Sequence, residues 1–289
     1  MTRKITISLC TLTMSLISFF MIPAYAVDSP KDATATTISK NQALLTTLPF
    51  NDTQSFKNAE RGFIAPLPNN GVIKNAKGQT IWDLSKFSFI QKGAKSPDTV
   101  NPSLWRQSQL VVMAGLYKVT DNIDQVRSAD LSNITFIEGN NGIVIVDPLI
   151  STETAQAALN LYYQHRPKKP IVAVIYTHSH VDHYGGVRGV INEKDVKDGK
   201  VEIVAPEGFM KNAVAENVLA GNAMSRRASY MYGNLLPPSV KGQVGAGLGV
   251  TTSTGTVSLI PPTKIINKNQ QTLTLAGLKF IFYLAPDSE

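Results

Sequence analysis

The sequence predicts an α/β (α+β) fold in which strands and helices alternate around a layered core. Two runs rich in β-branched residues, 134–137 and 143–146, flank a Gly-Asn-Asn-Gly stretch, which is typical of a β-hairpin. A helix follows over 152–165, with Ser151 or Thr152 as its cap. The next run, 171–176, is apolar and is predicted to be a buried strand. Strands that precede and follow helices in this way indicate a layered domain.

The start of the chain has the pattern of a secretory signal peptide over residues 1–26. A basic pair at 3–4 precedes a largely apolar stretch at 5–22, and Ala-Tyr-Ala at 24–26 has the form that signal peptidases cleave. We therefore expect a periplasmic or secreted protein with no stable membrane insertion after cleavage; an uncleaved anchor is the alternative. Cleavage would remove Cys10, the only cysteine, so a metal site must use histidine and carboxylate ligands.

The rest of the chain changes character near residue 116. Residues 27–115 are predicted to wrap around a core as short helices and irregular structure, with Trp82 and Trp105 as apolar anchors. The polar beginning of this segment, to about residue 40, is predicted to be mobile. Residues 116–289 carry the strand and helix patterns and are predicted to form the layered domain.

Further elements are predicted beyond the buried strand. They are a short helix over 184–192, a strand over 201–204, a helix over 207–227, a long loop over 233–256 and a hairpin over 272–284 that turns at Ala276 and Gly277. Long loops inside domains are usually functional or mobile. The chain ends with a charged segment directly after a predicted strand, so we expect it to be truncated.

Three of the four histidines lie within six residues, on the loop that follows the buried strand. His178 and His180 share one face of an extended segment and can converge on one metal ion. Asp182 and His183 point elsewhere and can serve a second ion, as in two-metal hydrolytic sites. A loop whose histidines only form hydrogen bonds is the alternative. Four possible ligands at this spacing favour a metal-dependent hydrolase.

The motif His-x-His-x-Asp-His after an apolar strand resembles the signature of the metallo-β-lactamase superfamily, whose fold is an αββα sandwich with a binuclear metal site. Four more segments are similar to the linear primary alkylsulfatases, at residues 101–107, 130–133, 205–210 and 231–237. Those are secreted or periplasmic zinc enzymes that hydrolyse dodecyl sulfate and related surfactants. The resemblance implies a metallo-β-lactamase αββα sandwich, incomplete in this chain, and zinc-dependent hydrolysis of linear primary alkyl sulfates. Residues 116–289 would then be the N-terminal part of the catalytic domain.

The same resemblance implies the roles of individual residues. His178 and His180 would bind one Zn²⁺, and Asp182, which is also the candidate catalytic residue, would bind the second together with His183. A family carboxylate ligand matches Glu289. An acidic residue that orients the ligand loop matches Asp147.

Several other side chains are candidates for substrate contact. Tyr232 and Asn234 lie near the predicted pocket and can orient the ester, with a turn role as the alternative. Arg226 and Arg227 suit a sulfate group but also suit a solvated helix end, as does His165. The alkyl chain can run along apolar loop residues, with ordinary packing as the default alternative: Leu235, Leu236 and Val244.

The expected partner is a small alkyl sulfate molecule. The formal net charge is +7, but basic residues form no stripe with aromatic residues, so we expect no nucleic-acid binding. The family resemblance implies a homodimer for the full-length enzyme only. Members of the family continue past Glu289 with further metal ligands and sulfate-binding residues, and they carry an aromatic residue where this chain has Asp124.

Alternatives for the function stay open at this point. One is another hydrolase of the same fold that acts on a lactam, thioester or phosphoester. The second is an inactive truncated remnant. Manganese or iron in place of zinc is also open.

Overall fold

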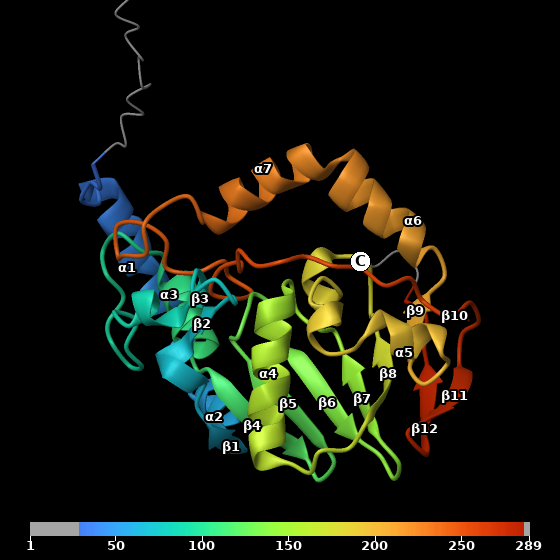
Figure 1. Cartoon of the computed structure of the whole chain (residues 1–289). Coiled ribbons are helices and arrows are strands. Elements are labelled where there is room, and N and C mark those ends of the chain that lie inside the picture. Colours follow the sequence, from blue (N-terminus) through green and yellow to red (C-terminus); the bar gives the residue numbers. More distant parts are fainter. Residues whose placement is uncertain (1–28, 286–289) are drawn as a thin grey trace, which may run out of the picture. The chain divides into compact units, whose positions relative to one another are not determined.

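An eight-stranded mixed sheet forms the centre of the fold in the computed structural model, which describes residues 29–285 (Figure 1). The strands follow the order β1-β4-β5-β6-β7-β8-β9-β10. Pairing is antiparallel from β1 to β7 and parallel from β7 to β10. The bounds are β1 Phe63–Ala65, β4 Gly115–Thr120, β5 Ile123–Arg127, β6 Ile134–Glu138, β7 Ile143–Val146, β8 Ile171–Ile175, β9 Glu202–Pro206 and β10 Lys264–Ile266. The parallel strands therefore present their carboxyl ends at one common edge.

The predicted β6–β7 hairpin and the helix after it are confirmed. Helix α4 (Thr152–His165) begins after Ser151 and lies across one face of the sheet (Figure 1). The Ser151 side chain forms no capping hydrogen bond to the helix backbone; its Oγ meets Thr154 Oγ1 at 2.9 Å instead. The rings of Phe136 and Tyr162 stack with centroids 4.4 Å apart, which joins β6 to α4.

Alternate residues of β7 serve opposite faces of the sheet, as the twofold period of a strand requires. Ile143 and Ile145 belong to the core beneath α4, whereas Val144 belongs to a second core on the other face. That second core is covered by a hairpin of β11 (Gln271–Leu275) and β12 (Leu278–Phe282). The hairpin turns at Ala276 (φ 53°) and Gly277 (φ 77°), so its predicted position is confirmed.

The segment before β4 is more ordered than the sequence analysis predicts. The stretch predicted to be mobile up to residue 40 is partly helical, because Thr34 caps α1 (Ala35–Thr47) by accepting a hydrogen bond from the Thr37 amide. Strand β1 pairs with β4, and Trp82 and Trp105 are buried as expected. The other elements are α2 Gln54–Glu60, η1 Pro68–Gly71, β2 Val72–Lys74, β3 Thr80–Asp83, η2 Leu84–Phe87 and α3 Pro102–Val111.

Two predicted helices beyond β8 are wrong in detail. The helix expected over 184–192 is only the 3₁₀ turn η4 (Val187–Gly189), because Gly185 and Gly186 bring this loop into close contact with the backbone before α4. The helix expected over 207–227 is divided into three parts. They are α6 Phe209–Val214, the π-helical segment η5 Ala215–Leu219 and α7 Gly221–Tyr232. Two shorter elements are η3 Val181–His183 and α5 Glu193–Lys197.

The long loop is confirmed and runs from the end of α7 to β10 without a further helix or strand. The predicted signal peptide (residues 1–26) and Glu289 lie outside the described residues. Across residues 29–285, the structure contains no helix with the length and apolarity needed to cross a membrane.

Candidate metal centre

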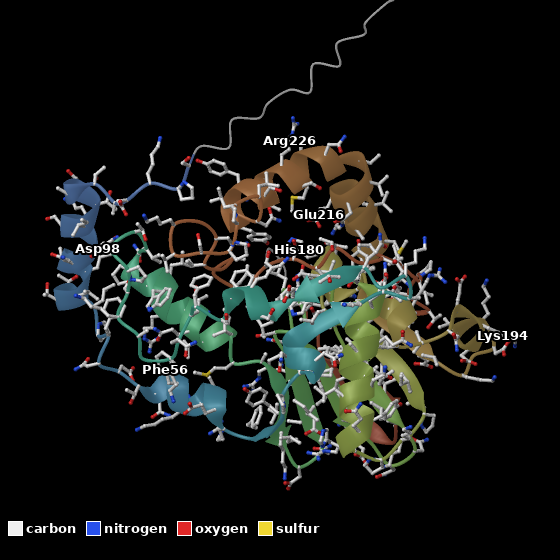
Figure 2. The ribbon with its side chains drawn as sticks, turned by 60° about the vertical axis from the view of Figure 1, so that its left-hand side comes forward. Phe56, Asp98, His180, Lys194, Glu216 and Arg226 are labelled. Atoms are coloured by element: carbon white, nitrogen blue, oxygen red, sulfur yellow. The ribbon has the colours of Figure 1, made fainter. Side chains whose placement is uncertain are left out.

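The histidine cluster lies at the carboxyl end of β8, at one edge of the sheet. Helices α6 and α7 lie over this edge (Figure 1), and Figure 2 shows His180 beneath Glu216. The loop leaves β8 at Tyr176, whose ring packs against Phe209 with centroids 5.0 Å apart. Ser132 Oγ donates a hydrogen bond to the backbone oxygen of Asp182. The loop that bears the candidate ligands is therefore fixed from both sides by buried elements.

Asp147 lies behind the cluster, one residue after β7. It has a left-handed backbone conformation (φ 55°), and its Oδ1 accepts a hydrogen bond of 2.9 Å from the Thr177 amide. Its Oδ2 lies 2.7 Å from Thr177 Oγ1 and 2.8 Å from His183 Nδ1. One carboxylate thus holds both the start of the ligand loop and one of its imidazoles.

The three imidazoles gather on one side of the loop. The ring centroid of His178 is 4.0 Å from that of His183 and 4.8 Å from that of His180. His183 Nε2 lies 3.1 Å from Asp182 Oδ2. Among residues 29–285, however, no three His, Cys, Asp or Glu side chains already stand where they could jointly hold a metal ion.

The charges within the cluster are strongly coupled. Burial and the neighbouring His183 and His180 lower the pKa of His178, which keeps its imidazole neutral at pH 7. Burial opposes the charged form of His183, but hydrogen bonds to Asp147 and Asp182 raise its pKa to about 9. Burial likewise opposes ionised Asp182, and the hydrogen bond from His183 nevertheless holds the pKa of Asp182 below its usual range.

Glu216 is a site residue that the sequence analysis missed. It lies on the π-helical segment η5, and its Oε1 is 3.7 Å from His180 Nε2 (Figure 2). Its other oxygen, Oε2, is buried with no hydrogen-bond partner in the described part of the chain. Single-turn π-helices occur frequently at functional sites, but their presence is not visible in a sequence pattern.

Two cavities meet at the cluster. The larger, of about 850 Å³, is lined by Asp147 and all four predicted loop ligands together with Glu216, Arg227 and Tyr232. The smaller, of about 180 Å³, is lined by His180, Asp182, Glu216 and Tyr232 among others. The structure therefore brings Tyr232 and Arg227 to the predicted ligands.

Other candidates lie away from both cavities. Asn234 donates a hydrogen bond of 3.3 Å to Thr252 Oγ1 and lines neither cavity. His165 is exposed at the end of α4, as expected. Of the three residues expected along an apolar path, Val244 is buried in the core, and Leu235 and Leu236 are exposed and line neither cavity.

The donor set suits a zinc-type metal. Three imidazoles and the carboxylates of Asp182 and Glu216 are ligand types that zinc accepts, and Cys10 lies outside the described residues. The buried, unpartnered Oε2 of Glu216 is the type of atom that a nearby cation would satisfy. The chemistry of the side chains therefore fits a metal, although their positions do not yet form a closed ligand set.

Comparison with known proteins points to one family. Residues 127–282 match the metallo-beta-lactamase superfamily. A linear primary-alkylsulfatase of Pseudomonas sp. is 64% identical over 266 residues, which are 92% of this chain and 39% of that protein. An alkyl/aryl-sulfatase of Saccharomyces cerevisiae is 50% identical over 259 residues, 90% of this chain and 40% of its own length.

The fold agrees with a solved structure from the same group of proteins. A stereoselective inverting sec-alkylsulfatase from Pseudomonas sp. superposes with a TM-score of 0.84 at 50% identity, covering 88% of this chain and 40% of that chain. The chain thus spans about two fifths of the length of the relatives it matches. The resemblance to the linear primary alkylsulfatases is confirmed, and the match over residues 127–282, which includes the whole histidine cluster, shows that the chain belongs to the metallo-beta-lactamase superfamily.

Proposed function

We propose that this chain carries the metal-binding loop of a zinc-dependent alkylsulfatase, which hydrolyses linear primary alkyl sulfates such as dodecyl sulfate to an alcohol and sulfate. The observation that supports this most is the gathering of three imidazoles and Asp182 under a cavity of about 850 Å³ at the carboxyl end of β8. The similar proteins are named as alkylsulfatases, and this supports a sulfate ester as the substrate. Zinc, when bound, would lower the pKa of a water molecule and so supply a nucleophile near neutral pH.

The side chains of the loop would hold the metal. His178 and His180 would serve one ion, and Asp182 and His183 the other, in line with the family resemblance. The lowered pKa of His178 supports this role, because a neutral imidazole offers its lone pair to a cation. Glu289 is proposed as a further ligand.

Two carboxylates would position these ligands without binding substrate. Asp147 would fix the ring of His183 through Nδ1, and Nε2, which faces Asp182 in the metal-free protein, would lose its proton to bind the metal. Glu216 faces Nε2 of His180, so we propose that it orients this ring in the same manner. A carboxylate that accepts a hydrogen bond from one ring nitrogen also makes the other ring nitrogen of that histidine a stronger metal ligand.

Substrate contact would fall to residues on α7. Arg227 and Tyr232 line the large cavity, and a guanidinium pairs well with a tetrahedral oxyanion. Asn234 stays a weaker proposal, since its amide nitrogen bonds Thr252. The proposal also includes export after removal of residues 1–26, absence of nucleic-acid binding, and a homodimer of the longer enzyme.

The test is release of sulfate from dodecyl sulfate by the protein as its cells make it, loaded with zinc. The proposal predicts sulfate release that a chelator stops and that added zinc restores. A parallel panel of a β-lactam, a thioester and a phosphoester addresses the other reactions known for this fold. Faster hydrolysis of any of these three than of dodecyl sulfate would overturn the choice of ester.

A further inference from the structure

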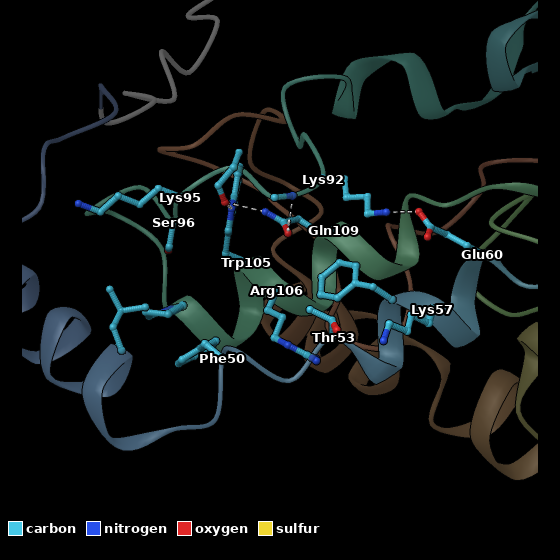
Figure 3. A pocket seen from close by; sticks show the side chains of 15 residues that line it. Phe50, Thr53, Lys57, Glu60, Lys92, Lys95, Ser96, Trp105, Arg106 and Gln109 are labelled. Atoms are coloured by element: carbon cyan, nitrogen blue, oxygen red, sulfur yellow. Dashed lines mark hydrogen bonds and ion pairs between the residues drawn. The ribbon is translucent and has the colours of Figure 1, made fainter.

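A third cavity lies in the segment before β4 and shares no lining residue with the two cavities at the histidine cluster. Its volume is about 580 Å³, within the range of roughly 300–1,000 Å³ that is typical of small-molecule sites. It lies between α1, α2, α3 and the loop 92–96 (Figure 3). We call it the N-terminal cavity.

Apolar and aromatic side chains form the body of the N-terminal cavity. They are Leu45, Phe50, Phe56, Pro102 and Trp105. The Trp105 ring is fixed because its Nε1 donates a hydrogen bond of 2.8 Å to the Ala94 backbone oxygen, which also accepts from Gln109 Nε2 at 2.8 Å. These contacts fix the part of the wall that Trp105 forms.

Cations surround these apolar walls. Four basic residues line the cavity, namely Lys57, Lys92, Lys95 and Arg106, against one carboxylate, Glu60. Lys92 pairs with Glu60, and Arg106 lies over the Phe56 ring, 5.2 Å from its centroid. In the part of the chain that the structure describes, Lys57 and Lys95 have no carboxylate partner. Figure 3 shows Lys95 at one end of the cavity and Lys57 at the other.

This combination of surfaces selects one class of ligand. An apolar wall favours a hydrocarbon chain, and unpaired ammonium groups at the rim favour a negative charge. A purely polar anion would leave the aromatic residues uncovered, and an apolar molecule would leave the lysines unpaired. We propose that the N-terminal cavity binds a single-chain amphiphile with an anionic head group, at a site separate from the histidine cluster.

The proposal goes beyond the proposed hydrolysis, because the N-terminal cavity contains none of the candidate metal ligands. It gives the protein a second place for a surfactant anion or a fatty acid. Both sources share the same chemistry, an alkyl chain with a sulfate, sulfonate or carboxylate at one end. The alkyl chain would lie against Trp105 and Phe50, and the head group would approach Lys57 or Lys95.

Trp105 reports on the cavity directly. The chain has two tryptophans, and of these Trp105 lines the cavity whereas Trp82 does not. Bromododecanoate, whose bromine quenches tryptophan fluorescence on contact, is titrated below its micelle concentration. We expect saturable quenching of one tryptophan, lost in Trp105→Phe and displaced by dodecanesulfonate, which is not a sulfate ester and is not hydrolysed. Dodecanoate is the second competitor, and whichever of the two anions displaces the probe at the lower concentration carries the preferred head group.

Charge is tested with matched double variants. Lys57→Gln/Lys95→Gln should weaken binding by roughly 1.5- to fivefold, the range for loss of one exposed charge pair at whichever end holds the head group. Lys194→Gln/Lys197→Gln removes the same charge from α5, away from Phe56 in Figure 2, and should leave binding unchanged. Dodecyltrimethylammonium, with the opposite charge, should not displace the probe.

Binding in the N-terminal cavity should not depend on the histidine cluster. The double variant His178→Ala/His180→Ala should keep the quenching of Trp105, which separates this proposal from the proposed hydrolysis. Absence of saturable quenching in the wild-type protein would overturn the proposal. Equal binding by the Lys57→Gln/Lys95→Gln and Lys194→Gln/Lys197→Gln variants would overturn it as well.

Discussion

Asp147 connects the end of one strand to the loop that leaves the next. Its Oδ2 accepts from Thr177 Oγ1 and from His183 Nδ1, at 2.7 and 2.8 Å. We predict that Asp147→Ala weakens zinc binding by about 10- to 100-fold, because the ring of His183 loses its orientation. Zinc affinity is measured by competition with a coloured chelator. Asp121→Ala, at a fully exposed carboxylate, is the control and should leave the affinity unchanged.

Glu216 offers a more selective test, because Gln keeps the shape of the side chain and removes its charge. We predict that Glu216→Gln lowers zinc affinity by roughly tenfold and leaves the unfolding temperature of the metal-free protein unchanged or higher. The second result is expected because the buried Oε2 has no partner in the described residues. Glu207→Gln, at an exposed position before α6, is the matched control. A metal-free protein that is destabilised with intact zinc affinity would show a purely structural role.

Spacing alone predicted only the site residues that are neighbours along the chain, whereas the family resemblance pointed to Asp147 and the position of Arg227 and Tyr232 was one of several alternatives. His178, His180, Asp182 and His183 follow one strand, so their proximity was predictable from spacing alone. The position of Glu216 depends on the path of the chain through β9 and α6, and on a π-helical turn that no local pattern reveals. Leu235 and Leu236 line neither cavity, and this too was not predictable, since apolar character does not tell which way a loop side chain points.

At the scale of elements, one ion pair joins the end of α4 to β5. Arg166 Nη2 and Nε lie 2.8 and 2.9 Å from the two carboxylate oxygens of Asp124, whose side chain is 5% exposed. This bidentate pair explains the acidic residue where the family resemblance leads us to expect an aromatic one. The Arg166 side chain is 26% exposed and can be hydrated when Asp124 is removed. The Asp124 carboxylate would stay buried when Arg166 is removed.

We therefore predict unequal effects of the two single variants. Arg166→Ala leaves a buried carboxylate without its partner and should lower the free energy of unfolding by about 3 kcal/mol. Asp124→Ala leaves an arginine that water can reach, so its cost should be smaller, about 1 kcal/mol. Urea unfolding of both variants checks this order. A larger effect of Asp124→Ala would contradict the argument from burial.

Glu153 is one of the residues that join the start of α4 to the long loop after α7. Glu153 accepts hydrogen bonds from the Thr256 amide at 2.8 Å and from Thr256 Oγ1 at 2.9 Å. Burial opposes its charge, but the bonds from Thr256 hold the pKa of Glu153 below its ordinary value of 4.5. A lowered pKa in the folded state means that the stabilisation is present above pH 4.5 and is lost as the pH falls through the folded value.

The prediction is a pH-dependent difference between the wild type and Glu153→Gln. The wild type should be more stable above pH 4.5, and the difference in free energy of unfolding should shrink as the pH falls further. Urea unfolding at several pH values gives this difference. A difference that stays constant over the whole range would mean that the charge of Glu153 does not hold the loop.

Elements with a strong local pattern were predictable, and those that depend on distant partners were not. The β6–β7 and β11–β12 hairpins carry β-branched runs around turn residues, so the sequence placed both. Helix α1 has no buried residue and hence no apolar face to reveal it. The pairing of β1 with β4 joins segments far apart in the sequence, which composition alone does not show.

For the whole molecule, the two faces of the sheet are covered to different extents in the described residues. Helix α4 and the segment before β4 cover one face, and the β11–β12 hairpin covers part of the other. The chain spans about two fifths of the length of its relatives, and the four loop ligands account for only part of the binuclear site that the family resemblance implies. Metal binding is therefore the property on which the whole account depends.

The most direct test is sulfate release from dodecyl sulfate by the natural protein, measured with and without zinc and in the variant His180→Ala. We predict release that depends on zinc and is abolished by a chelator and by the variant. Sulfate release that persists in the chelated protein, or a zinc-loaded protein that releases none, would contradict the central claim.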